Sequence, residues 1–223
     1  MIKPYYQDDL ATIYCTDSRK VLPKLEYADV ILTDPQFFLP PVAHRTKGGG
    51  QWFGSLGDLV MIEEAYKWLF DESQRILSDS GHLYINCHDR SYPIFFRLAY
   101  TRWEKSQMIV WYKPSGRIGR GWRRAHELIL HASNKAAQYT DGFRLNVVGI
   151  MPVRTMRRGH PAEKPGELGD FILEAVPSPG ILVDPFMGSG TYIFSAIRNG
   201  FQAIGIELEE RYCEAVARKL QKG

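Results

Sequence analysis

A carboxylate, a proline and an aromatic ring follow one another directly after an apolar segment near the N-terminus. Residues 30–33 lead into Asp34, Pro35, Gln36 and Phe37, at what should be the carboxyl end of a strand, where open α/β sheets bind their ligands. An exocyclic base amine is a poor nucleophile because its lone pair is delocalised into the ring. We predict that Asp34 Oδ and the Pro35 carbonyl accept the amine hydrogens and localise that lone pair, while Phe37 stacks on the base.

Such an amine is hidden inside a nucleic-acid duplex, so the target nucleotide must be flipped out, and an aromatic platform offsets part of the lost stacking. Taken alone, however, an Asp-Pro pair after a strand is equally well explained as a simple turn. The interpretation therefore depends on a second motif.

That second motif is a glycine-containing loop in the C-terminal third of the chain. The segment 181–183 runs into Asp-Pro-Phe-Met-Gly-Ser-Gly-Thr at 184–191 and then into a helical pattern, and Glu207 follows the next predicted strand. A strand, a glycine turn and a helix let a ligand approach the backbone closely, and a carboxylate at the next strand end can accept hydrogen bonds from ribose hydroxyls. The candidate cofactor-binding residues here are Asp184, Phe186, Gly188, Gly190, Thr191 and Glu207.

A dinucleotide is the obvious competing ligand for this loop. The third glycine of its motif would fall at Ile193, however, and Asp184 would repel a pyrophosphate. S-adenosylmethionine has no phosphate and carries an ammonium and a sulfonium, so an acidic glycine loop attracts it. We expect S-adenosylmethionine as the cofactor and no metal.

Together the two loops resemble the DNA amino-methyltransferases of bacteria and phages, in the permuted β-group order in which catalysis precedes cofactor binding. The resemblance spans nearly the whole chain. It implies transfer of a methyl group to adenine N6 in double-stranded DNA, because Asp rather than Ser stands at position 34. Cytosine N4 is the alternative target.

Three further segments resemble this family. Cys15-Thr16-Asp17 is similar to its acidic motif that meets the cofactor adenine, although Asp17 could simply cap the helix that follows. The segment His160-Pro161-Ala162-Glu163-Lys164-Pro165 is similar to the element that contacts the methionine end of the cofactor, so the resemblance adds His160 and Lys164 to the cofactor site. Arg124 to Glu127 is similar to the segment before the family's last edge strand.

One departure from the family pattern puts activity in question. Where the family's Asp-Pro-Pro-Tyr or Asp-Pro-Pro-Phe motif has a second proline, this chain has Gln36, which adds a backbone N–H and frees φ. Gln36 is compatible with a natural variant, with an altered base preference, or with a catalytically impaired relative that still binds DNA. A dehydrogenase on a similar sheet is a more distant alternative.

Basic residues are concentrated in two stretches. The first has no acidic residue between positions 113 and 124, and the second directly precedes His160. Charge runs are usually solvated faces, but beside the two motifs they are predicted phosphate contacts. The candidate DNA-binding residues are Lys113, Arg117, Arg120, Arg123, Arg124, Arg154, Arg157 and Arg158.

The elements that must position these residues alternate between short apolar runs and amphipathic helical patterns. Strands are expected at 11–15, 29–33, 82–87, 108–112, 128–131, 181–183 and 203–206, and helices at 62–77, 165–175, 192–199 and 211–220. We predict an α/β, Rossmann-like class I S-adenosylmethionine-dependent methyltransferase fold, with a mostly parallel seven-stranded sheet and an antiparallel edge strand formed where 108–112 meets 128–131.

The chain organisation predicted from this pattern is one domain spanning 1–223. Its catalytic region covers 1–134, a short DNA-recognition loop 135–159, and the cofactor-binding region 160–223. Two long loops are expected, at 38–58 and 135–161. With so little chain left outside the core, sequence recognition should be short or lax.

Composition agrees with a globular intracellular protein. The chain has 223 residues, of which 44% are hydrophobic and 24% charged, and a net charge of +3 that is too small to indicate nucleic acid by itself. Three cysteines lack disulfide or zinc spacing, and no signal peptide or membrane span is recognisable. We expect a cytoplasmic protein of a prokaryote or its phage that does not associate with membranes. The sequence leaves monomer and homodimer open.

Overall fold

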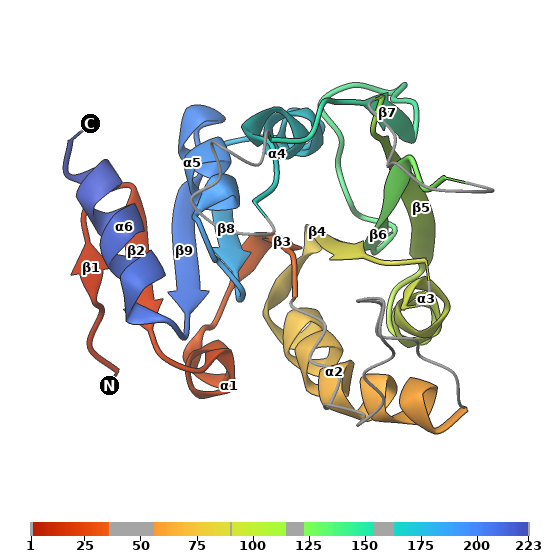
Figure 1. Ribbon diagram of the computed structural model, residues 1–223, viewed down its shortest axis with the longest axis horizontal. Helices are drawn as coiled ribbons and strands as arrows, with labels where there is room; N and C mark the ends of the chain where they lie inside the picture. The colour runs from red at the N-terminus through yellow and green to blue at the C-terminus, as the bar shows by residue number, and fades with distance from the viewer. Residues whose placement is uncertain (1, 36–55, 90, 115–122, 154–162, 223) are drawn as a thin grey trace.

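The computed structural model describes residues 2–35, 56–89, 91–114, 123–153 and 163–222, with the side chains of the helix at 56–76 described from residue 61 onward. Within these residues the strands form one nine-stranded sheet in the order β1-β2-β9-β8-β3-β4-β6-β5-β7 (Figure 1). Its strands are β1 (Tyr6–Gln7), β2 (Ala11–Cys15), β3 (Ala28–Thr33), β4 (Leu77–Cys87), β5 (Lys105–Tyr112), β6 (His126–Ser133), β7 (Val147–Gly149), β8 (Ile181–Asp184) and β9 (Gln202–Glu207).

The strand that carries the predicted catalytic residues lies at the centre of the sheet. β3 pairs in parallel with β8 on one side and with β4 on the other, and the ladder aligns Ile31 with Val183 and with Leu83. Because both faces of a central parallel strand are covered, its sequence is a continuous apolar run rather than an alternating one. The carboxyl ends of β2, β9, β8, β3 and β4 therefore meet at one edge, and this edge holds Asp34 and the predicted glycine loop.

Helices cover both faces of the sheet, and successive residues of β3 point to opposite layers. Ile31 packs in a core with residues of α1, α2 and α3, whereas Val30 and Leu32 pack with residues of α4, α5 and α6. Figure 1 shows α2 and α3 below the strands and α4 above them. The helices are α1 (Ser18–Val21), followed by the 3-10 turn Leu22–Lys24, α2 (Leu56–Ile76), α3 (Tyr92–Tyr100), α4 (Gly166–Leu173), α5 (Thr191–Arg198) and α6 (Glu210–Leu220).

The predicted fold class is confirmed, with two additions at the edges of the sheet. β5 and β6 are antiparallel neighbours as expected, and β6 also pairs antiparallel with β4. They do not form the edge, because β7 pairs in parallel with β5 outside them, and β1 pairs antiparallel with β2 at the other edge. The sheet thus has two more strands than the seven predicted. The prediction of a loop throughout 135–161 was wrong at Val147–Gly149, where two β-branched residues extend the sheet.

The helix expectations were less complete than the strand expectations. All four predicted helices are present, but α2 begins at Leu56, inside the predicted loop 38–58. α3 was not predicted, although Pro93 in its first turn is a favourable helix start. The described helices include none long and apolar enough to cross a membrane.

Candidate active site

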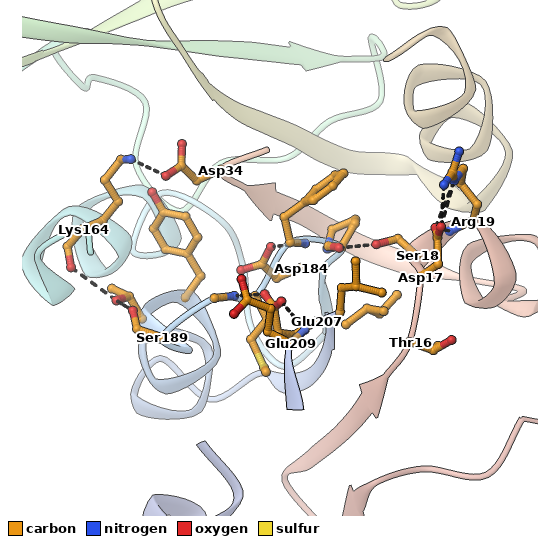
Figure 2. A pocket seen from close by; sticks show the side chains of 18 of the residues that line it. Thr16, Asp17, Ser18, Arg19, Asp34, Lys164, Asp184, Ser189, Glu207 and Glu209 are labelled. Carbon is orange, nitrogen blue, oxygen red and sulfur yellow. Dashed lines mark hydrogen bonds and ion pairs between the residues drawn. The ribbon is translucent and has the colours of Figure 1, made fainter. Parts of the chain in front are cut away.

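A cavity at the carboxyl edge of the sheet is lined by Asp34, the first residue of the predicted catalytic loop. Asp34 directly follows β3 and lines a cavity of about 360 Å³, while the adjacent Pro35 is buried (Figure 2). The predicted catalytic residues Gln36 and Phe37 lie outside the described residues. The cavity is also lined by most of the predicted cofactor residues, namely Asp17, Lys164, Asp184, Phe186, Gly188, Thr191 and Glu207. The structure therefore brings Asp34, the first predicted catalytic residue, and the predicted cofactor loop to one cavity.

The glycine loop takes a conformation that side chains rarely allow. Gly188 and Gly190 have φ angles of 50° and 79°, in the left-handed region. A Cβ on Gly190 would lie 2.6 Å from Val216 Cγ2 of α6, so this position is closed to larger residues by strain and by contact. Gly190 precedes the first residue of α5, Thr191, and its tight turn lets the backbone line the cavity without side chains filling it.

Glu207 ends β9 and is fixed by two backbone groups. Its Oε2 accepts from Gly188 N at 2.9 Å and its Oε1 from Glu209 N at 2.8 Å. A carboxylate oxygen has a second acceptor position, so Glu207 can still accept hydrogen bonds from a ligand in the cavity. This rigid placement agrees with the predicted role toward a pair of ribose hydroxyls.

Asp17 lies on the same wall of the cavity. Its side chain accepts from Arg19 N at 2.9 Å and thereby caps α1, and it also pairs with the Arg19 guanidinium. The hydrogen bond from Arg19 lowers the pKa of Asp17 below its ordinary value. Asp17 therefore both caps α1 and lines the cavity.

Asp184 connects the two motif-bearing strands. It is 1% exposed, and its Oδ1 accepts from Thr33 Oγ1 at 2.7 Å and from Phe186 N at 3.0 Å. Burial, with smaller contributions from the nearby carboxylates Asp34 and Glu207, raises the pKa of Asp184 to about 7 against the opposing effect of the two hydrogen bonds. The carboxyl end of β8 is thus tied to the last residue of β3.

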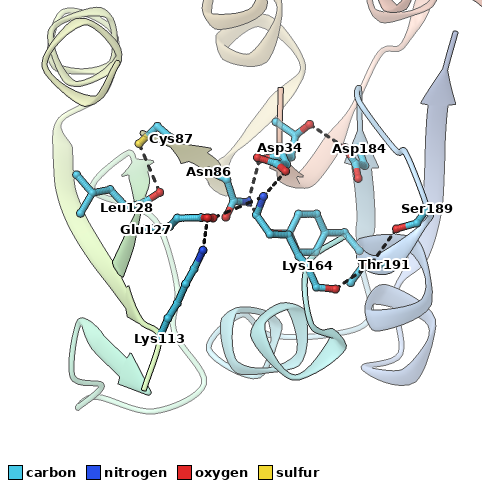
Figure 3. Close-up of polar contacts among 12 residues, drawn as sticks. Asp34, Asn86, Cys87, Lys113, Glu127, Leu128, Lys164, Asp184, Ser189 and Thr191 are labelled. Atoms are coloured by element: carbon cyan, nitrogen blue, oxygen red, sulfur yellow. Dashed lines mark hydrogen bonds and ion pairs between the residues drawn. The ribbon is translucent and has the colours of Figure 1, made fainter. Parts of the chain in front are cut away.

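Lys164 is the main cation on the catalytic side of the cavity. Its Nζ donates to Asp34 Oδ2 and lies 3.7 Å from Glu127 Oε2, and its side chain is 11% exposed (Figure 3). Burial alone would lower the pKa of Lys164, but the two carboxylates raise it above its ordinary value, so the group is an ammonium. The resemblance predicted Lys164 at the methionine end of the cofactor, and in the structure its ammonium contacts the carboxylate of Asp34. His160 lies outside the described residues.

Several residues of the site were not predicted from the sequence. Asn86 Nδ2 donates to Tyr192 Oη at 2.5 Å and to the Thr33 carbonyl at 3.2 Å, at the strand end beside Asp34. Trp68 of α2 lines the cavity with its ring centroid 6.3 Å from that of Phe186. Asn86 could have been found as a polar residue at the end of a predicted strand, whereas Trp68 and Tyr192 resemble ordinary helix core in the sequence.

The charge of the lining fits a cationic ligand. Six carboxylates line the cavity against the basic side chains of Arg19 and Lys164, and both of these are paired with a lining carboxylate. A phosphate would meet repulsion at this lining, while an ammonium or a sulfonium would be attracted. The carboxylates are Asp17, Asp34, Glu163, Asp184, Glu207 and Glu209.

Three of the eight predicted DNA-binding residues lie in the described part of the chain. Arg123 is exposed, and Arg124 is exposed and pairs with Asp89 at 2.9 Å. Lys113 is mostly buried, and its ammonium pairs with Glu127. The other five, Arg117, Arg120, Arg154, Arg157 and Arg158, lie outside the described residues.

Comparison with known protein families shows to which family the chain belongs. A family model described as DNA methylase, of the N6/N4 methyltransferases, matches residues 28–218. The chain belongs to the N6/N4 DNA methylase family. The match contains both motif loops and the strands that carry them.

Curated relatives of this DNA methylase are type II methyltransferases of bacteria. The type II methyltransferase M2.DpnII of Streptococcus pneumoniae is 28% identical, over 99% of this chain and 93% of its own length. M2.LlaDCHI of Lactococcus lactis subsp. cremoris is 26% identical, over 100% of this chain and 94% of its own length. These two relatives are thus matched over nearly their whole length.

Solved structures confirm the fold of the DNA methylase. The M1.HpyAVI complex with S-adenosylmethionine superimposes with a TM-score of 0.72 at 20% identity, covering 95% of this chain and 99% of the other. The cytosine-N4-specific PvuII DNA methyltransferase gives a TM-score of 0.75 at 16% identity, covering 96% and 88%. At such identities the likeness concerns the fold.

Proposed function

We propose that this DNA methylase transfers the methyl group of S-adenosylmethionine to the exocyclic N6 amine of adenine in double-stranded DNA. The observation that carries the proposal is the position of Asp34, which lines the cofactor cavity and directly follows the central strand β3. A base amine bound at Asp34 would face the same cavity that holds the cofactor. Methyl transfer requires this adjacency, because the amine must attack the methyl carbon in line.

The cofactor assignment is supported by the acid lining and the glycine loop. S-adenosylmethionine supplies an electrophilic methyl group on a positively charged sulfur when it is bound. Glu207 is held by two backbone N–H groups and would accept hydrogen bonds from the ribose, and Phe186 and Trp68 provide an apolar wall for the adenine. Asp184 and Asp34 contribute negative charge on the side where the amine must be bound.

The residues of the chain that act on the amine are Asp34 and Pro35. The Asp34 carboxylate accepts one amine hydrogen and the Pro35 carbonyl the other, which localises the nitrogen lone pair. Lys164 holds Asp34 Oδ2, so the carboxylate is oriented before the base arrives. Phe37 is proposed to stack on the flipped base, and Arg123 and Arg124 to contact phosphates near the entrance.

Product analysis tests the function and the base separately. Protein incubated with methyl-labelled S-adenosylmethionine and unmethylated DNA, followed by digestion to nucleosides and mass spectrometry, should yield labelled N6-methyladenine. N4-methylcytosine in its place would refute the adenine assignment while leaving DNA methylation intact. The absence of any methylated nucleoside, together with salt-dependent DNA binding, would refute the enzymatic proposal in favour of a silent DNA-binding relative.

Two variants make this assay specific to the proposed site. Asp34→Asn should abolish label transfer while leaving cofactor binding by calorimetry measurable. Asp71→Asn is its matched control, because Asp71 also pairs with a cation, Arg102, but lies on α2 away from the cavity lining. Gln36→Pro restores the motif of the family, and an increase in rate would identify Gln36 as the cause of a low activity.

A further inference from the structure

Glu127 lies between two ammonium groups near the catalytic carboxylate. It is the second residue of β6, its side chain is 28% exposed, and its two oxygens face different lysines. Oε1 accepts from Lys113 Nζ, and Oε2 lies 3.7 Å from Lys164 Nζ, which in turn bonds Asp34. Figure 3 shows Lys113, Glu127, Lys164 and Asp34 in sequence, with charges that alternate in sign.

The outer end of this row is fixed to the core of the sheet. Lys113 Nζ lies 4.3 Å from the ring centroid of Trp111, and Trp111 is 1% exposed with its indole N–H donating to the Ile150 carbonyl at 2.8 Å. Lys113 N also donates to the Ala125 carbonyl at 2.6 Å. Held between a buried ring and a carboxylate, this ammonium has little freedom to reach a DNA phosphate.

Lys164 is shared between two carboxylates, and the sharing determines how strongly it holds Asp34. Its Nζ bonds Asp34 directly and lies farther from Glu127. The negative charge of Glu127 therefore weakens the hold of Lys164 on Asp34. The four side chains are between 11% and 28% exposed, so their interactions are screened less than those of a surface pair. Loss of Glu127 would leave Lys164 entirely to Asp34, and a carboxylate held in this way accepts an amine hydrogen less well.

We propose that Glu127 is a positioning residue for Asp34, acting through Lys164, and that Lys113 serves to hold Glu127 rather than a DNA phosphate. This inference rests on the proposed methyl transfer at Asp34. It assigns Lys113, which the sequence predicted to contact DNA, to the active site. It also gives the Arg124 to Glu127 segment a role that its position before a strand did not suggest.

The kinetic test compares Glu127→Gln, Lys113→Met and the double variant. Glu127→Gln should lower kcat about tenfold or more, as expected for one charge-assisted contact, with the KM for DNA and the affinity for S-adenosylmethionine within about twofold of the unchanged protein. Lys113→Met should lower kcat by a smaller factor. Its effect should vanish in the Glu127→Gln background, because Lys113 acts only through Glu127.

The opposing hypothesis gives a different pattern. If Lys113 contacts a phosphate, Lys113→Met raises the KM for DNA in both backgrounds and reduces the salt dependence of binding by about one unit of slope. That result would overturn the assignment. Lys113→Arg keeps the cation and should retain most of kcat, whereas a merely structural role predicts that all these variants change stability without a selective change in kcat.

A control and a second readout separate this inference from the proposed function. Arg218 and Glu214 form an exposed cation–carboxylate pair on α6, 2.6 Å apart and outside the cavity lining, so Arg218→Met and Glu214→Gln should leave kcat unchanged. The Nζ resonance of Lys164, assigned by its loss in Lys164→Arg, should shift in Glu127→Gln, and Lys113→Met should shift it only when Glu127 is present. An unchanged Lys164 Nζ resonance in Glu127→Gln would refute the coupling even if the enzyme is active. If the resonance shifts as expected but the wild-type protein methylates no DNA, only the proposed function is refuted.

Discussion

Replacing Asp184 by asparagine should stabilise the protein at neutral pH and weaken its cofactor site. The side chain is 1% exposed, and burial raises its pKa to about 7 from an ordinary value of 3.8. Asparagine is close to isosteric, and its Oδ1 can accept the same hydrogen bonds from Thr33 and Phe186. The substitution therefore removes the buried charge while retaining the contacts that join β3 to β8.

The magnitude follows from proton linkage. The interval between 3.8 and about 7, at about 1.4 kcal/mol per pH unit, corresponds to about 4 kcal/mol. Between these two values the folded protein keeps a proton on Asp184 that the unfolded chain has lost, so this group lowers the free energy of unfolding as pH rises. Below pH 3.8 Asp184 is protonated in both states and no stability is lost. Above about pH 7 it is ionised in both states, and the folded state bears the full cost of the buried charge.

Urea unfolding of wild type and Asp184→Asn across pH 4 to 8 measures the difference directly. We expect the advantage of the variant to grow with pH by several kcal/mol, with about 4 kcal/mol as the upper limit. Other titrating groups, such as the buried His131 whose pKa burial lowers to about 3, cancel in this difference. Two parallel profiles, separated by a constant amount, would refute the assignment of a raised pKa to Asp184.

An aspartate with the opposite behaviour provides the control. Burial opposes ionisation of Asp8, but the hydrogen bonds from Tyr6, Ala11 and Leu10 together outweigh it and lower the pKa overall. The stability that it contributes is present above its ordinary pKa and is lost as pH falls. Asp8→Asn should therefore be most destabilising at neutral pH, and its difference from wild type should shrink on acidification.

The same carboxyl group should couple cofactor binding to proton release. A cationic cofactor in the cavity that Asp184 lines favours the ionised form, so binding near pH 7 should release a fraction of a proton. Calorimetry in two buffers of different ionisation enthalpy detects that proton. In Asp184→Asn the release should disappear and the affinity should fall, most clearly above pH 7.

Two further predictions concern the walls of the cavity. Gly190→Ala introduces a Cβ 2.6 Å from Val216 Cγ2 at a φ of 79°, so it should lower the free energy of unfolding by about 2 kcal/mol in urea titration. Gly142→Ala, where no atom lies within 4 Å of the new Cβ, should change stability little, and equal effects of the two would contradict the packing argument. Glu207→Ala removes the acceptor of two backbone N–H groups and should weaken S-adenosylmethionine binding by about tenfold or more in calorimetry. The exposed Glu214, paired with Arg218, gives the control variant Glu214→Ala, and a matching loss of affinity there would show that the effect is not local.

The strands of this fold were largely predictable from the sequence, because a parallel strand that is buried on both faces consists of a short run of apolar residues. β2 was predicted at its observed bounds, Ala11–Cys15, and the other six predicted strands fall almost entirely within observed ones. β7 was missed because three residues carry no periodicity, and their place depends on pairing with β5. α3 was missed because its apolar run is short and is equally compatible with a buried strand.

The residues that line the cavity were predictable where they belong to a short motif and stand at the end of a strand or directly after it. Asp34, Asp184 and Glu207 fall into this class, and the topology of a parallel sheet brings their strand ends together. Asn86 and Tyr192 are 106 residues apart and meet only because β4 and α5 flank the same strand end. No local pattern encodes that contact, so sequence reasoning could not find it.

The role of a charged residue depends on its partner, which the charge pattern of the sequence does not give. Lys113 and Arg123 belong to the same basic stretch, yet the side chain of Lys113 is 19% exposed and paired with Glu127, while Arg123 is exposed. The desolvation of a buried ammonium must be offset by a nearby carboxylate, so burial of Lys113 depends on Glu127. Glu127 in turn links Lys113 to Lys164 and to Asp34, the proposed catalytic residue. The carboxylate neighbours of a lysine beside such a site therefore decide whether it can contact the substrate or is held by the protein. The fold of the sheet places these neighbours, and the sequence spacing does not reveal them.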